Sequence, residues 1–173
     1  MASQKPKPGR KTPPSQKASR YRFVVSACLA GIDCNFKGGN ALSKKVKELF
    51  EAGTALAACP EVAGGLGSPR ERCEICRGGG AEVLNGTARV FSSSGKDNTI
   101  PYIRGAARIA GIVKSLGIKK AILKSGSPSC GPDRIYDGTF SGKSRSGNGV
   151  FAAMLKQGGI RLYSDKYDMK RNT

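Results

Sequence analysis

Hydrophobic residues along this chain occur in short continuous runs. These runs alternate with longer stretches in which apolar residues recur with the period of an α-helix. Four runs are too short for helices and are flanked by Gly, Pro or polar residues, and each predicts a strand: 23–27, 55–58, 121–123 and 160–163. Apolar positions three or four residues apart predict three helices: from Asn40 or Ser43 to about Ala52, from Thr99 to about Leu116, and 149–156. Gly53 and Gly117 follow the first two helices, where glycine commonly ends a helix.

Strands and helices alternate along the chain, which is typical of a mainly parallel sheet covered by helices. The predicted fold class is therefore α/β, a single Rossmann-like domain. Asn85 and Gly86, between the stretches 81–84 and 87–91, predict a small β-hairpin. Segments 62–80 and 133–149 are rich in Gly and polar residues, and we expect mostly irregular loops there.

The chain is strongly basic, with a net charge of +18 over 173 residues. Residues 1–22 carry seven Lys and Arg and no Asp or Glu, so +11 of this charge lies on the remainder. A basic chain favours a polyanionic partner such as RNA, or an anionic substrate, although a basic tail can equally serve only solubility. Composition predicts a disordered basic tail at 1–20, a folded domain at 21–165 and a frayed end at 166–173.

No apolar stretch is long enough to cross a bilayer, and the polar N-terminus is unlike a secretory signal. We therefore expect a cytoplasmic protein with no membrane partner, whose six cysteines stay reduced and serve a metal site or catalysis. The chain has no histidine, which excludes Ser-His and Cys-His nucleophile pairs and histidine ligands to zinc. Any chemistry then depends on Cys, Asp, Glu, Lys, Ser or a cofactor.

Three cysteines, Cys28, Cys59 and Cys130, each follow a predicted strand. Parallel strands end at the same edge of a sheet, where open α/β sheets place their ligands. Three thiolates that converge there can hold an iron–sulfur cluster and leave one iron without a protein ligand. The alternative is that these cysteines are small buried residues that pack as hydrophobes do.

Cys73 and Cys76 form a Cys-x-x-Cys pair, and Cys34 is a sixth thiol. Together with two further cysteines, the pair would form a zinc site. By itself it is also consistent with a redox-active dithiol or with two surface thiols of no function. Spacing does not distinguish these interpretations.

Polar residues lie beside the strand-end cysteines. Glu61, two residues after Cys59, can transfer protons if Cys59 is a ligand, or it can form a salt bridge on a loop. Ser127 and Ser129 can face the same cavity as the thiols, or they can belong to a Ser/Pro turn. Lys124 can hold an anion or a carbonyl oxygen, or it can extend along the surface. Lys124 and Ser129 are thus candidates for binding a substrate.

The content and order of four motifs resemble the thiouracil desulfurase (TudS-type) family, formerly a domain of unknown function. The motifs are VSACLAGIDC at 25–34, CPEVAGGLGSPR at 59–70, KSGSPSCG at 124–131 and IYDGTFSG at 135–142. The resemblance covers about 23–164, which is nearly the whole predicted domain.

This resemblance implies an oxygen-sensitive 4Fe–4S cluster held by Cys28, Cys59 and Cys130. It implies a non-redox desulfidase that replaces the sulfur of a thiolated pyrimidine, such as 2-thiouracil, by oxygen and releases sulfide. It also implies that Glu61 and Ser127 lie near the substrate as proton-transfer and positioning groups. A soft iron site does prefer a thiocarbonyl sulfur, in agreement with this chemistry.

Two features depart from the family pattern. Where family members usually have Pro and Ala before the Glu-Ile of 74–75, this chain has Arg72 and Cys73, and the additional thiols here can be idle or bind a second metal. The basic tail is also outside the pattern. It keeps two alternatives open: desulfidation of thiouridine in tRNA, with basic residues on the phosphates, and a non-catalytic zinc-stabilised RNA-binding module.

Overall fold

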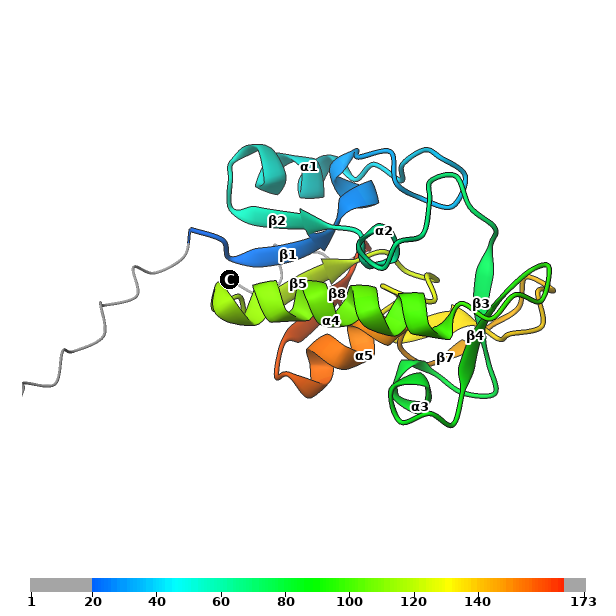
Figure 1. Cartoon of the computed structure of the whole chain (residues 1–173). Coiled ribbons are helices and arrows are strands. Elements are labelled where there is room, and N and C mark those ends of the chain that lie inside the picture. Colours follow the sequence, from blue (N-terminus) through cyan, green and yellow to red (C-terminus); the bar gives the residue numbers. More distant parts are fainter. Residues whose placement is uncertain (1–19, 167–173) are drawn as a thin grey trace, which may run out of the picture.

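The computed structural model describes residues 20–166 (Figure 1). Its main sheet has four parallel strands in the order β2-β1-β5-β8. The strands are β1 (Phe23–Ser26), β2 (Ala55–Ala58), β5 (Lys120–Leu123) and β8 (Arg161–Ser164). The four predicted strands and the α/β fold class are thereby confirmed, whereas the predictions for 1–19 and 167–173 lie outside the described residues. Within 20–166, no helix is long and apolar enough to cross a membrane.

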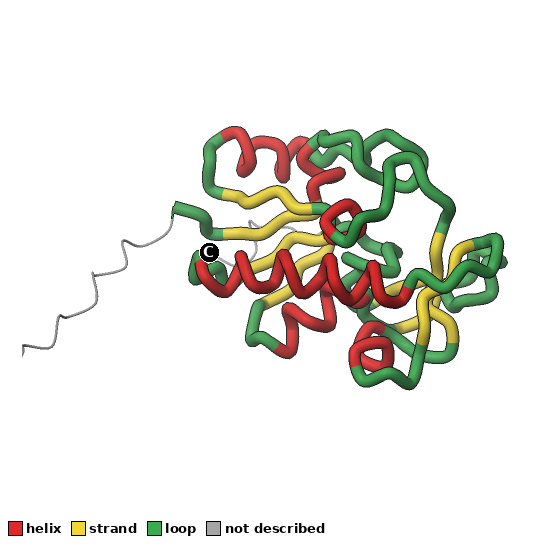
Figure 2. The backbone as a smooth tube through the Cα atoms, in the orientation of Figure 1, coloured by secondary structure: helices red, strands yellow, loops and turns green. Residues whose placement is uncertain are grey.

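Helices cover both faces of this sheet (Figures 1 and 2). They are the 3-10 helix η1 (Ala27–Ala30), α1 (Lys44–Glu51), α4 (Thr99–Ser115) and α5 (Val150–Gln157). The three α-helices match the segments predicted from the apolar period. Gly53 and Gly117, beyond the ends of α1 and α4, have φ angles of +68° and +67°. Glycine adopts this left-handed conformation without steric cost, which explains why both helices end there.

The side chains of the central strand β1 alternate between two hydrophobic cores, which explains why helices cover both faces of the sheet. Successive side chains of a strand point to opposite faces. Phe23 and Val25 pack in one core with Val46 of α1, whereas Val24 packs in the other core with Phe151 of α5. Helix α1 therefore covers one face of the sheet, and α4 and α5 cover the other (Figure 1).

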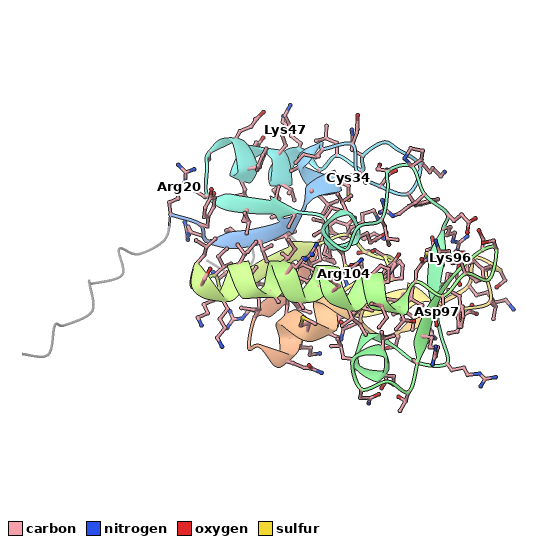
Figure 3. All side chains as sticks on the ribbon, viewed as in Figure 1. Arg20, Cys34, Lys47, Lys96, Asp97 and Arg104 are labelled. Carbon is pink, nitrogen blue, oxygen red and sulfur yellow. The ribbon has the colours of Figure 1, made fainter. Side chains whose placement is uncertain are left out.

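The short helix α2 (Pro60–Ala63) lies against α4 with the two backbones in close contact. A Cβ on Gly105 of α4 would lie 1.8 Å from the carbonyl oxygen of Pro60. Arg104, also on α4 (Figure 3), donates a hydrogen bond from Nε to the carbonyl oxygen of Gly64 at 3.1 Å. Because there is no room for a side chain between them, α4 sets the position of α2 and of the residues that α2 carries.

Gly105→Ala is expected to lower the free energy of unfolding by about 3 kcal/mol, because the added methyl group has no space against Pro60. The matched control is Gly111→Ala in the same helix, where no atom lies within 4 Å of the added Cβ. That change is expected to stabilise the helix by about 0.5–1 kcal/mol. Urea unfolding of both variants measures the difference, and equal effects of the two substitutions would contradict the close contact.

A second group of elements lies beyond the carboxyl ends of the sheet strands, at the right of Figure 1, and we call it the outer lobe. It contains β3 (Cys73–Cys76), α3 (Gly80–Leu84), β4 (Arg89–Ser92), β6 (Arg134–Tyr136) and β7 (Ser144–Ser146). Strand β3 pairs antiparallel with β4, and β6 pairs antiparallel with β7. The carboxyl edge of the main sheet therefore faces a separate set of short strands.

The prediction of a β-hairpin at 81–91 is wrong for its first strand, 81–84. That segment forms α3, and β4 pairs instead with β3, which lies in the part of 62–80 expected to be irregular. Glu82 explains the helix, because its carboxylate accepts a hydrogen bond from the N–H of Gly79 at 2.7 Å and so caps the first turn. Segment 133–149 likewise contains β6 and β7 where mostly loop was expected. These strands have three residues each, which is too short for a hydrophobic period to be visible.

Candidate functional site

A cavity of about 490 Å³ lies where the carboxyl edge of the sheet faces the outer lobe. Five of the six cysteines line it: Cys28, Cys34, Cys59, Cys73 and Cys130. Charged, hydroxyl and aromatic side chains complete the lining, among them Ser26, Glu61, Arg70, Arg72, Tyr102, Lys124, Ser127 and Tyr136. This volume falls in the range of pockets that hold small organic ligands.

The parallel sheet brings the three strand-end cysteines to this cavity. Cys28 lies in η1, directly after β1, and Cys59 lies directly after β2. Cys130 follows β5 across the loop 124–129. Strands β2, β1 and β5 are neighbours in the sheet, so their carboxyl ends lie side by side. The structure thus brings these distant thiols together, while their role as metal ligands stays a prediction.

The loop that carries Cys130 is held from two sides. Ser127 Oγ accepts hydrogen bonds from the backbone N–H groups of Ser129 and Cys130, at 3.1 and 3.0 Å. At the start of α5, the N–H of Val150 donates to the carbonyl oxygen of Pro128 at 2.9 Å. The first N–H groups of a helix have no partner within the helix, so they are available to fix this loop.

Cys34 joins the group although no predicted strand precedes it (Figure 3). Its thiol lies within hydrogen-bonding reach of the thiols of Cys28 and Cys59. The hydrogen bond with Cys28, together with burial, raises the pKa of the Cys34 thiol to about 11. Asn35 bends the loop that brings Cys34 here, because its side-chain oxygen accepts a hydrogen bond from the N–H of Gly39 at 3.1 Å.

The donor set fits an iron–sulfur cluster, since thiolates are the usual ligands of such clusters. Burial raises the pKa of the Cys130 thiol, and a hydrogen bond with Cys34, followed by burial, raises the pKa of the Cys59 thiol. Thiolates at these positions therefore need a nearby positive charge, which iron supplies. Within 20–166, no three Cys, Asp or Glu side chains lie close enough to hold a single metal ion.

Glu61 lies in the first turn of α2 and lines the cavity. Nε and Nη2 of Arg70 contact Oε2 of Glu61 at 2.7 and 2.6 Å, and the two side chains are only 9% and 12% exposed. Arg70 is anchored in turn by hydrogen bonds from Nη1 to the carbonyl oxygens of Cys34 and Gly67, at 3.1 and 2.8 Å. Because the pair uses Oε2, Glu61 can present Oε1 to a ligand in the cavity.

The other predicted site residues differ in their access to the cavity. Ser127 and Lys124 line it, and Lys124 forms an ion pair with Asp165 at 3.6 Å. Ser127 Oγ already accepts two backbone hydrogen bonds, so its proton is available for donation to a ligand. Ser129 is 0% exposed and is not among the residues that line the cavity. The structure therefore does not bring Ser129 to the position expected of a substrate-binding residue.

Cys73 and Cys76 do not face each other. They occupy the two ends of β3, three residues apart, and therefore point to opposite faces of the β3–β4 ribbon. Cys73 is buried and accepts a hydrogen bond from Asn98 at 3.4 Å, whereas the Cys76 thiol donates to the carbonyl oxygen of Gly138 at 3.3 Å. A zinc site and a redox-active dithiol both need the two sulfurs on one side, so neither interpretation fits β3.

Comparison with known proteins identifies the family of the chain that forms this cavity. The family model for 2-thiouracil desulfurase matches residues 23–167. The chain belongs to the 2-thiouracil desulfurase family. The match spans both the main sheet and the outer lobe, so both walls of the cavity belong to the desulfurase domain.

Two proteins similar to this desulfurase family member extend the comparison. The chain is 48% identical over 143 residues to the uncharacterized protein YbbK of Bacillus subtilis (strain 168), a match that covers 83% of this chain and 95% of YbbK. It is 42% identical to the solved structure of a [4Fe-4S]-dependent thiouracil desulfidase, TudS (DUF523Vcz), with a TM-score of 0.73 over 83% of this chain and 90% of that one. The family and the fold class predicted from the sequence are both confirmed.

Among the cavity residues to which sequence reasoning assigned no role are Cys34, Arg70 and Ser26. Cys34 was visible only as a sixth thiol, and Arg70 only as the end of a motif. Ser26 ends β1, where its hydroxyl accepts a hydrogen bond from the N–H of Lys124 at 3.0 Å and lies within reach of the Cys130 thiol. Each of the three stands inside a family motif, but its partners come from other segments of the chain.

Proposed function

We propose that this protein is a cluster-dependent desulfidase that converts the thiocarbonyl group of a 2-thiouracil-like base into a carbonyl group and releases sulfide. One observation carries the proposal: three strand-end cysteines, Glu61 and Ser127 share one cavity in a member of the 2-thiouracil desulfurase family. The activity named for the similar solved structure supports the same chemistry here.

Cys28, Cys59 and Cys130 are the residues that we propose as ligands of a 4Fe–4S cluster. When bound, the cluster supplies an iron site without a protein ligand, and such a soft site prefers a thiocarbonyl sulfur to an oxygen. Cys34 lies within hydrogen-bonding reach of Cys28 and Cys59, and its single S–H can donate to one of these two sulfurs. In this assignment Cys34 is a positioning residue.

Glu61 and Ser127 are the residues that we propose for proton transfer and positioning. Hydrolysis adds the oxygen of water to the thiocarbonyl carbon, and both protons of that water leave with the sulfur. Glu61, held at Oε2 by Arg70, can accept a proton from the attacking water at Oε1. Ser127 donates a hydrogen bond from its hydroxyl to a heteroatom of the base and so positions it. Lys124, which lines the cavity, is the further substrate-binding residue in this proposal.

Reconstitution with iron and sulfide under anaerobic conditions, followed by incubation with 2-thiouracil, tests this function. We expect a brown protein that produces sulfide and uracil in equal amounts without an electron donor, because the conversion is a hydrolysis. The cluster-free protein from the same preparation serves as the control and is expected to produce neither. A protein that carries the cluster but leaves 2-thiouracil and 4-thiouracil unchanged would contradict the proposal.

The cytoplasm is the compartment that we propose, because the described cysteines are all free and thiols stay reduced there. The proposed partner is a small thiolated base that fits the cavity of about 490 Å³. Binding of RNA through the basic tail stays a prediction, since residues 1–19 lie outside the described part of the chain.

A further inference from the structure

Arg72 and Tyr136 form a stacked pair in the part of the cavity wall that the outer lobe contributes. The guanidinium carbon of Arg72 lies 4.3 Å from the centroid of the Tyr136 ring, and both residues line the cavity. Arg72 precedes β3 and Tyr136 ends β6, so the pair joins the two strand pairs of the outer lobe. Stacking on an aromatic face restrains the guanidinium group.

A buried carboxylate holds this pair in place. The side chain of Glu74 is 0% exposed, and its Oε1 forms an ion pair with Nη2 of Arg72. Its Oε2 accepts hydrogen bonds from the N–H groups of Gly138 and Phe140, at 3.0 and 3.1 Å. A buried carboxylate is costly unless its oxygens are paired, and here both are paired. Because Glu74 does not line the cavity, it acts on a ligand only by positioning Arg72.

Arg72 keeps hydrogen-bond donors that this arrangement does not use. A guanidinium group carries five N–H donors in one plane. Within 20–166, the side chain of Arg72 forms one hydrogen bond, from Nη2 to Glu74, and it is 32% exposed. An arginine restrained in this way can bind an oxygen in the cavity with little further loss of side-chain entropy.

We propose that Arg72 binds the unreactive exocyclic oxygen of the substrate, so that the site selects thiolated pyrimidines that also carry an oxo group. This inference rests on the proposed desulfidase function. The two exocyclic atoms of such a base differ in softness. The soft sulfur therefore prefers iron, whereas the harder oxygen prefers a charged N–H donor. The cysteines come from the sheet edge and Arg72 from the outer lobe, so the two walls of the cavity match the two ends of the base.

A comparison of 2-thiouracil with 2-thiopyrimidine, which lacks this oxygen, tests the selection. We expect the wild-type kcat/KM to be about 10- to 100-fold higher for 2-thiouracil, because the analogue leaves a charged donor without a partner. Arg72→Ala is expected to remove this preference by raising KM for 2-thiouracil, with little change for 2-thiopyrimidine. Arg72→Lys keeps a positive charge beside Glu74 and so preserves folding. It is expected to lose most of the preference, since one ammonium group cannot replace the planar fork.

Arg89→Ala is the matched control, because Arg89 pairs with Asp97 on the same lobe (Figure 3), outside the cavity lining, and its side chain is 67% exposed. Its substrate preference is expected to equal that of the wild type. A preference that persists in both Arg72 variants would overturn the inference.

Calorimetric titration of the reconstituted protein with uracil gives a readout that needs no turnover. Binding about 10-fold weaker in Arg72→Lys than in the wild type is expected, and equal binding would overturn the role of Arg72. The titration also separates the two proposals. A wild-type protein that binds uracil through Arg72 but releases no sulfide from 2-thiouracil contradicts the desulfidase function and leaves the role of Arg72 supported.

Discussion

Replacement of Cys28, Cys59 or Cys130 by serine is expected to prevent assembly of a 4Fe–4S cluster and to slow sulfide release from 2-thiouracil more than about 100-fold. Loss of a group that only hydrogen-bonds to a metal ligand already costs about 10- to 100-fold in affinity or activity, and loss of a ligand costs more. All three thiols line one cavity, so each is in a position to contribute. Iron and acid-labile sulfide content after anaerobic reconstitution, together with visible absorption, measures the cluster.

The matched control for these variants is Cys76→Ser, and Cys34→Ser tests whether Cys34 is itself a ligand. Cys34 lies against two of the proposed ligands, and Cys76 points away to the carbonyl oxygen of Gly138. Both variants are expected to assemble the cluster. If Cys34→Ser loses the cluster while one of the three ligand variants keeps it, Cys34 replaces that residue in the ligand set.

Glu61→Gln is expected to lower kcat about 10²- to 10⁴-fold while the cluster content stays at the wild-type level. Glutamine has the same size and can still accept a hydrogen bond from Arg70, but it cannot take a proton from water. Sulfide release under saturating 2-thiouracil, measured anaerobically with cluster content determined on the same sample, separates lost chemistry from lost cofactor.

Glu51→Gln on α1 is the control for this substitution. Glu51 forms an exposed ion pair with Lys47 at 3.5 Å, and a surface pair of this kind contributes little to stability or activity. Its kcat is expected to equal that of the wild type. Wild-type turnover in Glu61→Gln would show that another group accepts the proton.

The strands and the cysteines that follow them are predictable from the sequence because the signals are local. A short apolar run bounded by polar residues or glycine, such as 121–123, predicts a strand without knowledge of its partners. Strands that run parallel end at one edge of the sheet, whatever the conformation of the loops between them. The convergence of Cys28, Cys59 and Cys130 follows from these two facts.

The outer lobe was not predictable in the same way. Asn85 and Gly86 are typical of a hairpin turn, but here they follow a helix, where Asn85 Oδ1 accepts a hydrogen bond from the N–H of Thr87 at 3.1 Å. Asn85 and Gly86 are therefore compatible both with a hairpin turn and with the end of a helix. The pairing of β4 with β3 decides between them, and that pairing joins residues well separated in the chain.

By itself the sequence determined the α/β class and the thiols that follow its strands, because hydrophobic period depends on near neighbours in the chain. The content and order of four motifs determined the family. Only the tertiary structure decided that Arg70 holds Glu61, that Cys34 joins the thiols and that Ser129 is buried outside the cavity lining. Cys34, Arg70 and Ser129 lie in loops with little regular structure of their own. Hydrogen bonds to distant segments, such as those from the start of α5 to 128–131, set the shape of such loops, and no local pattern encodes them.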